Sequence, residues 1–474
     1  MSAMMQRAPR RSELRWPLLL IGLITAYLGL FAARFADERL YADSGYYLMH
    51  VINQGVFRIE HGRWALTLSQ ALPLLGVKLG APLHALILLH SLNNVLWLVA
   101  CMLVAWRVLR APQAAVAIAA LHLIGLAHGL FCPIFELYYG ADLLILFLAA
   151  WRAEHLDRRV RAAMLVALFL AVISCHLMGL ALMAWALLLE RAWRERRLFA
   201  ALVIIGSTYL VLHALTVSDY EKDHLGLLRR AWHPGVVAGL FTLTHVLASV
   251  RYAVTHYPDV LALGLMASFL LLRDRGCRWK GVLLIAFLAA LHLVIAIKHT
   301  DPLHDRYREQ LNFPAIAAVI VALGLHAWHM GRARTTVLAS LFLAVLFRVA
   351  RAEQVAPFYT ARTVAIEGYI AEARANGMHK AIGPWSRSFG DNAHSVELSW
   401  SVSVESLLLS SADDPCCTVS IITQEDRAFG DVAQRLHRFV FRRWEILPEA
   451  WLDPRWFTAP TGRYEALPST VAVE

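Results

Sequence analysis

Long apolar stretches separated by short arginine-rich segments fill most of the first 350 residues, and this alternation limits the possible folds more than any other feature. A stretch of about 20 apolar residues crosses a bilayer as a helix, because a helix bonds its own backbone polar groups. Only 17% of the residues are charged, whereas soluble proteins carry about a quarter. We therefore predict a polytopic α-helical membrane protein.

The arginine-rich segments also predict how the chain crosses the membrane. Short basic loops stay on the cytoplasmic side, so one orientation must place all of them together. With a cytoplasmic N-terminus, this condition gives about eleven transmembrane helices, at 16–33, 85–106, 113–131, 137–151, a hairpin of two spans turning at 175–179, 198–216, 259–272, 281–297, 311–330 and 335–350. The net charge of +10 is concentrated in these loops and does not indicate nucleic-acid binding.

Two further apolar segments are expected to lie on the outer face of the membrane. The piece 64–79 is short and has no basic cluster after it, so it falls within a long first outer loop over residues 34–84. A second interfacial helix is expected over 236–256. The outer face is then the periplasmic side of a bacterial inner membrane.

Residues 351–474 differ in composition from the transmembrane part at 1–350. They are polar and contain no apolar run long enough to span a bilayer. Helical spacing at 363–376 and 426–441, together with a β-branched stretch at 418–423, predicts a small mixed α/β domain. Because the last span runs outward, this domain is expected in the periplasm.

The first outer loop contains the main catalytic candidate, Asp43, within the sequence YADSGYY. A carboxylate that is partly desolvated among aromatic rings is suited to act as a general base. In the alternative interpretation Asp43 only caps a short helix that begins at Ser44. If the first interpretation holds, the residues expected to line the substrate beside it are Tyr41, Tyr46 and Tyr47.

Four other polar residues are expected on the same face. His61 is a second catalytic candidate in the first outer loop, and Arg63 follows it as a substrate-lining residue. Glu136 begins the span at 137–151 and is either catalytic or a stabiliser of the helix N-terminus, where the dipole favours a carboxylate. His176 is a candidate because it lies at an outer turn.

A basic outer loop at 298–310 departs from the charge asymmetry of the other loops. Cations on the outer side indicate an anionic ligand, and a lipid phosphate or pyrophosphate at the interface is the natural one. In the alternative, the arginines pair with the acidic residues of a solvated loop. The candidates for phosphate binding are Lys298, His299, Arg306, Tyr307 and Arg308.

The sequence contains no glycine-rich phosphate loop, no serine nucleophile elbow, no zinc-type histidine pair and no cysteine pair with redox spacing. No cofactor is therefore expected.

In its arrangement of motifs the chain resembles the GT-C superfamily of membrane glycosyltransferases, which includes protein O-mannosyltransferases and aminoarabinose transferases. The similarity rests on the acidic-aromatic motif around Asp43 in a long first outer loop, on Arg306-Tyr307 ahead of Pro314, and on a C-terminal outer domain. The resemblance implies that Asp43 activates the acceptor and that Arg306, with Arg308 or Lys298, binds the donor phosphate. Ser44 stands where many relatives have a second acidic residue, which favours transfer without a metal ion.

The resemblance implies an enzyme that moves a sugar from a polyprenyl-phosphate donor to an acceptor glycan, lipid or protein by an inverting displacement. The donor, the acceptor and membrane lipids are the expected partners. Two alternatives remain open. One is a transporter or flippase of lipid-linked glycans, a class that typically has charged groups at mid-membrane. The other is a glycan ligase or polymerase.

Overall fold

The computed structural model describes residues 11–471 apart from 217, 220, 224–225, 227–228, 230–231, 299–304, 330–332 and 385–397. Among these residues six helical segments are long and apolar enough to cross a membrane. They are α1 (Arg11–Arg34), α5 (Leu83–Leu103) with its π-helical extension, α10 (Arg196–Thr216), α15 (Arg278–Lys298), α16 (Asp305–Val321) with the π-helical turn that follows it, and α17 (Ala333–Ala375). The prediction of a helical protein with apolar spans is thus confirmed at this level.

The other predicted spans correspond to shorter helices. These are α6 (Pro112–Leu121), α7 (Glu136–Trp151), α8 (Arg158–Ile173), α9 (Leu177–Leu189) and α14 (Pro258–Arg273). The predicted interfacial segments are α3 (Leu66–Ser69) with α4 (Ala71–Lys78), and α12 (Pro234–Leu240) with α13 (Leu243–His256). The last two meet at 59° and would count as a seventh span if taken as one.

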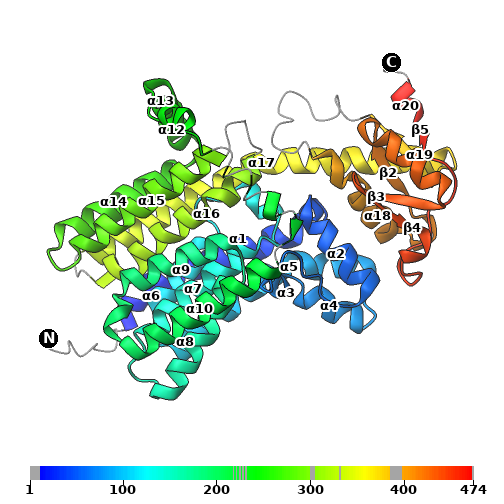
Figure 1. The fold of residues 1–474 in the computed structure, drawn as a ribbon. Coiled ribbons are helices and arrows are strands. Elements are labelled where there is room, and N and C mark those ends of the chain that lie inside the picture. Colours follow the sequence, from blue (N-terminus) through cyan, green and yellow to red (C-terminus); the bar gives the residue numbers. More distant parts are fainter. Residues whose placement is uncertain are drawn as a thin grey trace.

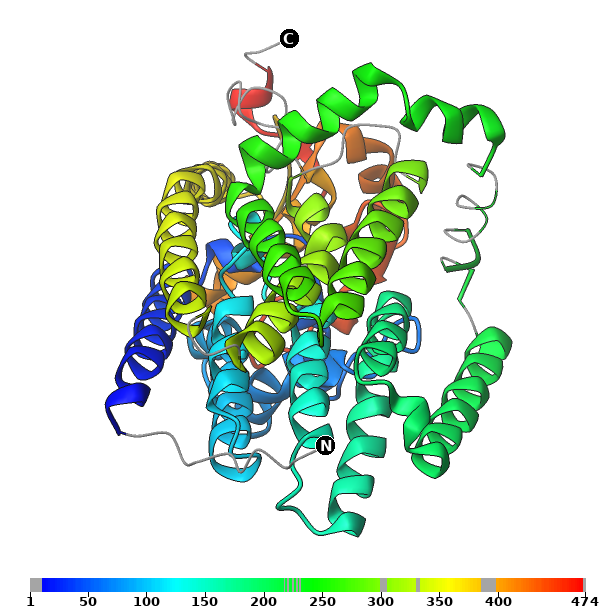
Figure 2. The same ribbon diagram turned by 90° about the vertical axis from the view of Figure 1, so that its left-hand side faces the viewer.

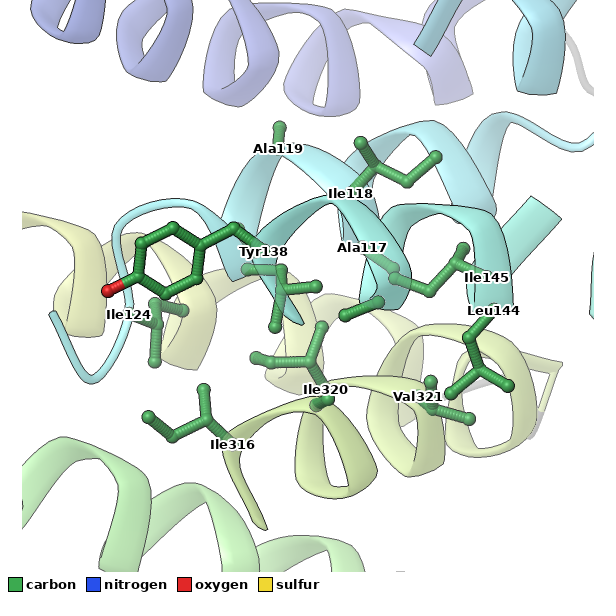
Figure 3. Close-up of a cluster of buried hydrophobic side chains, with 14 of the residues drawn as sticks. Ala117, Ile118, Ala119, Ile124, Tyr138, Leu144, Ile145, Ile316, Ile320 and Val321 are labelled. Carbon is green, nitrogen blue, oxygen red and sulfur yellow. The ribbon is translucent and has the colours of Figure 1, made fainter. Parts of the chain in front are cut away.

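The core of the bundle lies where α6, α7 and α16 meet. Every residue of α7 is buried, and Figure 3 shows Ile118 of α6, Ile145 of α7 and Ile320 of α16 within one apolar cluster. The turn after α16 approaches α6 closely at Gly324. A Cβ added at Gly324 would lie only 2.8 Å from the Cβ of Ala117 on α6. This packing holds the three helices that carry or adjoin the candidate site.

The predicted span at 113–131 is wrong as a single helix. Helix α6 ends at Leu121, and buried turns lead to a short 3-10 turn at His128–Phe131. Glu309 of α16 accepts hydrogen bonds from the backbone N–H groups of Ala127 (3.0 Å), His128 (3.2 Å) and Gly129 (2.6 Å). The unwound backbone is tolerated because these buried donors are satisfied by a distant carboxylate.

Replacing Glu309 with alanine is therefore expected to lower the free energy of unfolding by at least ~3 kcal/mol, because each buried group left unpaired costs about 1–3 kcal/mol. Thermal unfolding in detergent measures the change. Glu353→Ala is the control, since Glu353 pairs with Arg34 at an exposed position and should cost less than about 1 kcal/mol. Equal stability of the two variants would contradict this account of the break.

The arginine-rich loops that are described converge at one end of the bundle. Arg152, after α7, donates a hydrogen bond to the carbonyl of Leu325 (2.6 Å) and pairs with Glu190, after α9. The guanidinium of Arg191 lies 4.4 Å from the ring centroid of Trp279, at the start of α15. These contacts join loops that are far apart in sequence. Helices α12 and α13 lie toward the top of Figures 1 and 2, and the C-terminal strands lie at the right of Figure 1.

Helix α17 continues without a break from the bundle to the C-terminal strands (Figure 1). The predicted boundary at 350 therefore falls inside one helix of 43 residues, and the helix predicted at 363–376 is the last part of that helix, which ends one residue earlier than expected. Beyond it, β1 (Lys380–Gly383) pairs in parallel with both β2 (Ser420–Thr423) and β5 (Glu465–Ala466). The strand predicted at 418–423 is confirmed as β2.

Helices and a hairpin surround this small sheet. The helices are α18 (Val402–Asp413), α19 (Arg427–Arg435) and α20 (Pro468–Val471), and the hairpin is β3 (Arg438–Arg442) with β4 (Glu445–Pro448). The prediction of one helix over 426–441 is wrong in its second half. His437 has a φ of 50° after the end of α19, and β3 then buries Phe439 and Phe441 in the core.

Candidate functional site

The candidate site centres on an ion pair between the first outer loop and α16. Nη1 of Arg306 donates a hydrogen bond to Oδ2 of Asp43 over 3.2 Å. Asp43 is the first residue of α2 (Asp43–Gln54), and the N-cap position before it is Ala42, which has no polar side chain to cap the helix. The two residues are 263 positions apart in the chain, so only the fold brings them together.

The two partners differ in their exposure. The Arg306 side chain is 8% exposed, whereas that of Asp43 is 42% exposed. Nη1 of Arg306 also donates to Sγ of Cys132 at 3.2 Å, and the guanidinium lies 5.7 Å from the ring centroid of Tyr41. Its Nε is buried and has no hydrogen-bond partner among the described residues. A buried cation with this spare donor is suited to hold an anion, and the accessible carboxylate is suited to take a proton.

The backbone before Asp43 is strained. Ala42 has φ 58° and ψ −129°, a conformation that costs a residue with a Cβ about 1–3 kcal/mol. The side chain of Ala42 is fully buried. Gly45 packs closely against the same turn, because a Cβ added at Gly45 would lie 2.6 Å from the carbonyl oxygen of Leu40. Tight packing thus holds the turn that directs Asp43 toward Arg306.

A second ionic cluster lies around Arg63. Nη1 of Arg63 donates to the carboxylate of Glu136, and Nη2 lies 3.5 Å from Glu221. Glu221 also lies 3.1 Å from Nε2 of His213 on α10. Glu136 is the first residue of α7. The predicted candidates Glu136 and Arg63 are thus brought together, with Glu221 as a partner.

Tyr47 links the two clusters electrostatically. Burial raises the pKa of Tyr47 well above the usual range of a phenol, and the carboxylates of Glu60, Glu136 and Asp43 raise it further. The Tyr47 hydroxyl therefore stays protonated and donates a hydrogen bond to Glu60 over 3.3 Å. Tyr46 donates to the other oxygen of Glu60 at 2.5 Å.

The C-terminal elements and the first outer loop meet at the same tyrosines. Nη2 of Arg442, on β3, donates to the Tyr46 hydroxyl at 3.2 Å, and its guanidinium lies 4.2 Å from the centroid of the Tyr46 ring.

The predicted candidate His61 forms a hydrogen bond with Ser218 over 2.7 Å. Burial and the charge of Arg63 lower the pKa of His61, so this imidazole is neutral at pH 7.

The other predicted candidates belong to several different elements. Because α16 begins at Asp305, the predicted loop is helical from there, and residues two apart on a helix face different directions. Arg308 accordingly lies 4.5 Å from the ring centroid of Tyr252 on α13. Tyr307 follows Arg306 on α16, Lys298 is the last residue of α15, and His299 lies outside the described residues. His176 accepts a hydrogen bond from the backbone of Met178 at 3.0 Å and so caps α9.

The sequence analysis missed three residues of the site. Cys132 contacts Arg306, Glu60 binds both tyrosines of α2, and Glu221 pairs with Arg63. Only Glu60 carried a local indication, since it directly precedes His61 in the loop already under consideration. The other two depend on contacts between segments that are distant in sequence.

The chemistry of the site is that of charged side chains. Within the part of the chain that is described, no three His, Cys, Asp or Glu residues are grouped so that they could hold a metal ion. A half-exposed carboxylate can accept a proton from one reactant, and the buried guanidinium beside it can neutralise an anion on another.

In comparisons with known proteins, no family model, curated protein or solved structure matches the chain.

Proposed function

We propose that this protein is a membrane glycosyltransferase that moves a sugar from a polyprenyl-phosphate-linked donor to an acceptor glycan, lipid or protein. The observation that carries the proposal is the contact of 3.2 Å between Arg306 and Asp43. Such a pair supplies both groups that a single inverting displacement requires, a base for the nucleophile and a cation for the leaving phosphate.

The displacement uses the two groups in turn. The donor phosphate replaces the Asp43 carboxylate as the partner of Arg306, which frees the carboxylate to accept the proton of an acceptor hydroxyl. The hydroxyl oxygen bonds to the anomeric carbon as the bond from that carbon to the phosphate oxygen breaks. The electron pair leaves with the phosphate, whose charge Arg306 neutralises. Neither the proton transfer to Asp43 nor the neutralisation of the phosphate by Arg306 calls for a metal ion.

The remaining polar residues are assigned to positioning. Arg63 is engaged by Glu136 and Glu221, so we assign this cluster to orienting the acceptor beside Asp43. Tyr46 and Tyr47, held by Glu60, form the adjoining wall. The neutral imidazole of His61, bonded to Ser218, lies on the rim of this wall.

We also propose a bacterial inner-membrane topology of about eleven spans, in which the shorter helices complete the six long ones. The N-terminus is cytoplasmic, and the sheet and helices after α17 form a periplasmic α/β domain. The convergence of the described arginine-rich loops at one end supports this orientation.

Cysteine labelling tests the orientation. In a chain without its native cysteines, a cysteine at Arg194, in the basic loop after α9, should react with a membrane-impermeant maleimide only after the cells are opened. A cysteine at Arg455, near the C-terminus, should react in cells whose inner membrane is intact. Labelling of Arg194→Cys in intact spheroplasts would contradict the orientation.

A transporter or flippase of lipid-linked glycans is the second candidate. The buried pair of His122 and Asp142 in the bundle core, 2.8 Å apart, favours it, because ionisable residues inside a membrane domain often serve transport. A glycan ligase or polymerase differs from our proposal mainly in its acceptor.

Reconstituted protein separates these functions. Proteoliposomes are supplied with radiolabelled polyprenyl-phosphate sugars and a membrane extract that contains acceptors. The proposal predicts label on a new glycan, lipid or protein product. Movement of the labelled donor between leaflets without a product would overturn the proposal and favour the transporter.

A further inference from the structure

Three aromatic rings and one guanidinium form a cluster where the hairpin of β3 and β4 meets α2 (Figure 1). We call it the aromatic cluster; its members are Tyr46 on α2, Arg442 at the end of β3, Trp444 in the hairpin turn and Trp400 in a 3-10 turn (Ser399–Ser401). The guanidinium lies 4.2 Å from the centroid of the Tyr46 ring and 5.5 Å from that of Trp444. The centroids of Trp444 and Trp400 are 5.9 Å apart, so each member contacts the next.

The aromatic cluster is buried at one end and exposed at the other. Tyr46 is buried, whereas Trp444 is 58% exposed. Trp456, in the same part of the chain, shows what a structural tryptophan does: it is buried, and its Nε1 donates a hydrogen bond to the carbonyl of Ala81 at 2.9 Å. Packing explains the position of Trp456 but not the open face of Trp444. An exposed ring beside other rings is typical of a binding surface.

Paired charges border the exposed end of the aromatic cluster. The pairs are Arg442–Glu445, Arg443–Glu425 and Arg443–Asp426. The side chain of Glu425 is 56% exposed and that of Arg443 is 35% exposed, so a ligand can reach both. Two arginines against three carboxylates give no excess of positive charge. The surface therefore does not favour an anionic ligand or an anionic bilayer surface.

An aromatic face bordered by donors and acceptors matches an uncharged sugar. A pyranose ring presents C–H groups on its faces, and these stack on the electron-rich face of an indole. The hydroxyls around its edge can donate to a carboxylate such as Glu425 and accept from a guanidinium such as Arg443. A hydrocarbon chain would use the ring of Trp444 but neither of these charged groups.

Tyr46 connects the aromatic cluster to the candidate site. It follows Asp43 by three residues on α2, and residues three apart are neighbours on the surface of a helix. The Tyr46 hydroxyl accepts a hydrogen bond from Arg442 at 3.2 Å and donates one to Glu60 at 2.5 Å. A chain of sugars bound on Trp444 can therefore extend past Arg442 toward Asp43.

We infer that the aromatic cluster binds the acceptor, and that this acceptor is a glycan of more than one sugar residue. One sugar ring stacks on Trp444, and the hydroxyls of that ring bond to Glu425 and Arg443. The reacting hydroxyl, on another sugar of the same chain, lies beside Asp43. This inference rests on the proposed sugar transfer and deepens it, because it selects a glycan over the lipid and protein acceptors.

Fluorine NMR tests whether sugars reach Trp444. The full chain is labelled with fluorotryptophan and placed in lipid nanodiscs without a sugar donor. The probe is the mixture of water-soluble oligosaccharides that mild acid releases from the envelope of the same bacterium. We expect the probe to shift the resonance of Trp444, which is identified by its loss in Trp444→Phe. The resonance of Trp232, a ring that is also 58% exposed but lies before α12, should not move.

The affinity for the same oligosaccharides is compared among variants by titrating the saturation-transfer signal of the sugar protons. Trp444→Ala should lower the affinity by at least about fivefold, as truncation of an aromatic anchor usually does. Trp444→Phe, which keeps a ring, should lose less. Trp232→Ala is the matched control and should bind as the unmodified protein does.

Two results would overturn the inference. One is an equal affinity of Trp444→Ala and the unmodified protein for the oligosaccharides. The other is broadening of the Trp444 resonance by a spin-labelled lipid without any response to the probe, which would make Trp444 an anchor in the bilayer. Because the binding measurements contain no donor, they do not depend on sugar transfer in proteoliposomes. Failure of the enzymatic proposal and failure of the glycan site are therefore distinguishable.

Discussion

Replacing Asp43 with asparagine is expected to lower the rate of sugar transfer by about 10²–10⁴-fold, which is the usual contribution of a general base. Asparagine keeps the shape of the side chain but cannot accept the acceptor proton. Donor binding should persist, because Arg306 remains in place and loses a competing carboxylate. The measurement is single-turnover transfer from a radiolabelled donor, with donor affinity determined in parallel.

The matched control is Asp37→Asn, a change at an exposed aspartate in the same loop. It should transfer sugar at the unmodified rate. Asp43→Glu, which keeps a carboxylate but displaces it, should retain more activity than the asparagine variant. If purified and folded Asp43→Asn transferred sugar at the normal rate, the assignment of the base would be wrong.

Replacing Arg306 with glutamine is expected to lower kcat/KM for the donor by about 10²–10³-fold, as removal of a preorganised donor to a developing negative charge usually does. Lysine at this position keeps the charge but lacks the planar fork with which a guanidinium binds two phosphate oxygens at once, so Arg306→Lys should recover only part of the loss. Steady-state kinetics with varied donor concentration measures both variants.

Folding must be checked for these variants, because Arg306 is buried. Arg34→Gln removes a guanidinium that is 68% exposed and should change neither stability nor kcat/KM. Thermal unfolding of Arg306→Lys close to that of the unmodified protein, together with its reduced donor use, would separate a role in binding from a role in packing. A kcat/KM for the donor that is unaffected by Arg306→Gln would remove this residue from the phosphate site.

The positions of most helices could be predicted from sequence, because apolar length and arginine distribution are local properties. The break after Leu121 could not, since it depends on Glu309, a residue about 180 positions later whose carboxylate satisfies the freed backbone. Before the contact is known, Glu309 reads as one more acidic residue of a polar loop. The continuity of α17 was likewise hidden, because its composition changes from apolar to polar without a change in backbone conformation.

The candidate site was predicted in part. The charge asymmetry of the loops put Asp43 and Arg306 on one face, and the structure adds their direct contact. Arg308, which the prediction groups with Arg306, contacts a different neighbour, because the two side chains leave the start of α16 in different directions. Cys132 was missed because its contact with Arg306 joins two segments that no local pattern relates.

The central claim is that a lipid phosphate binds where Arg306 now meets Asp43. A cryo-electron microscopy map of the protein with a non-hydrolysable polyprenyl-phosphate sugar analogue measures this directly. We predict phosphate density within hydrogen-bonding distance of the Arg306 guanidinium, with the sugar facing Asp43. Clear analogue density elsewhere in the bundle, with the Arg306–Asp43 contact intact, would contradict the account.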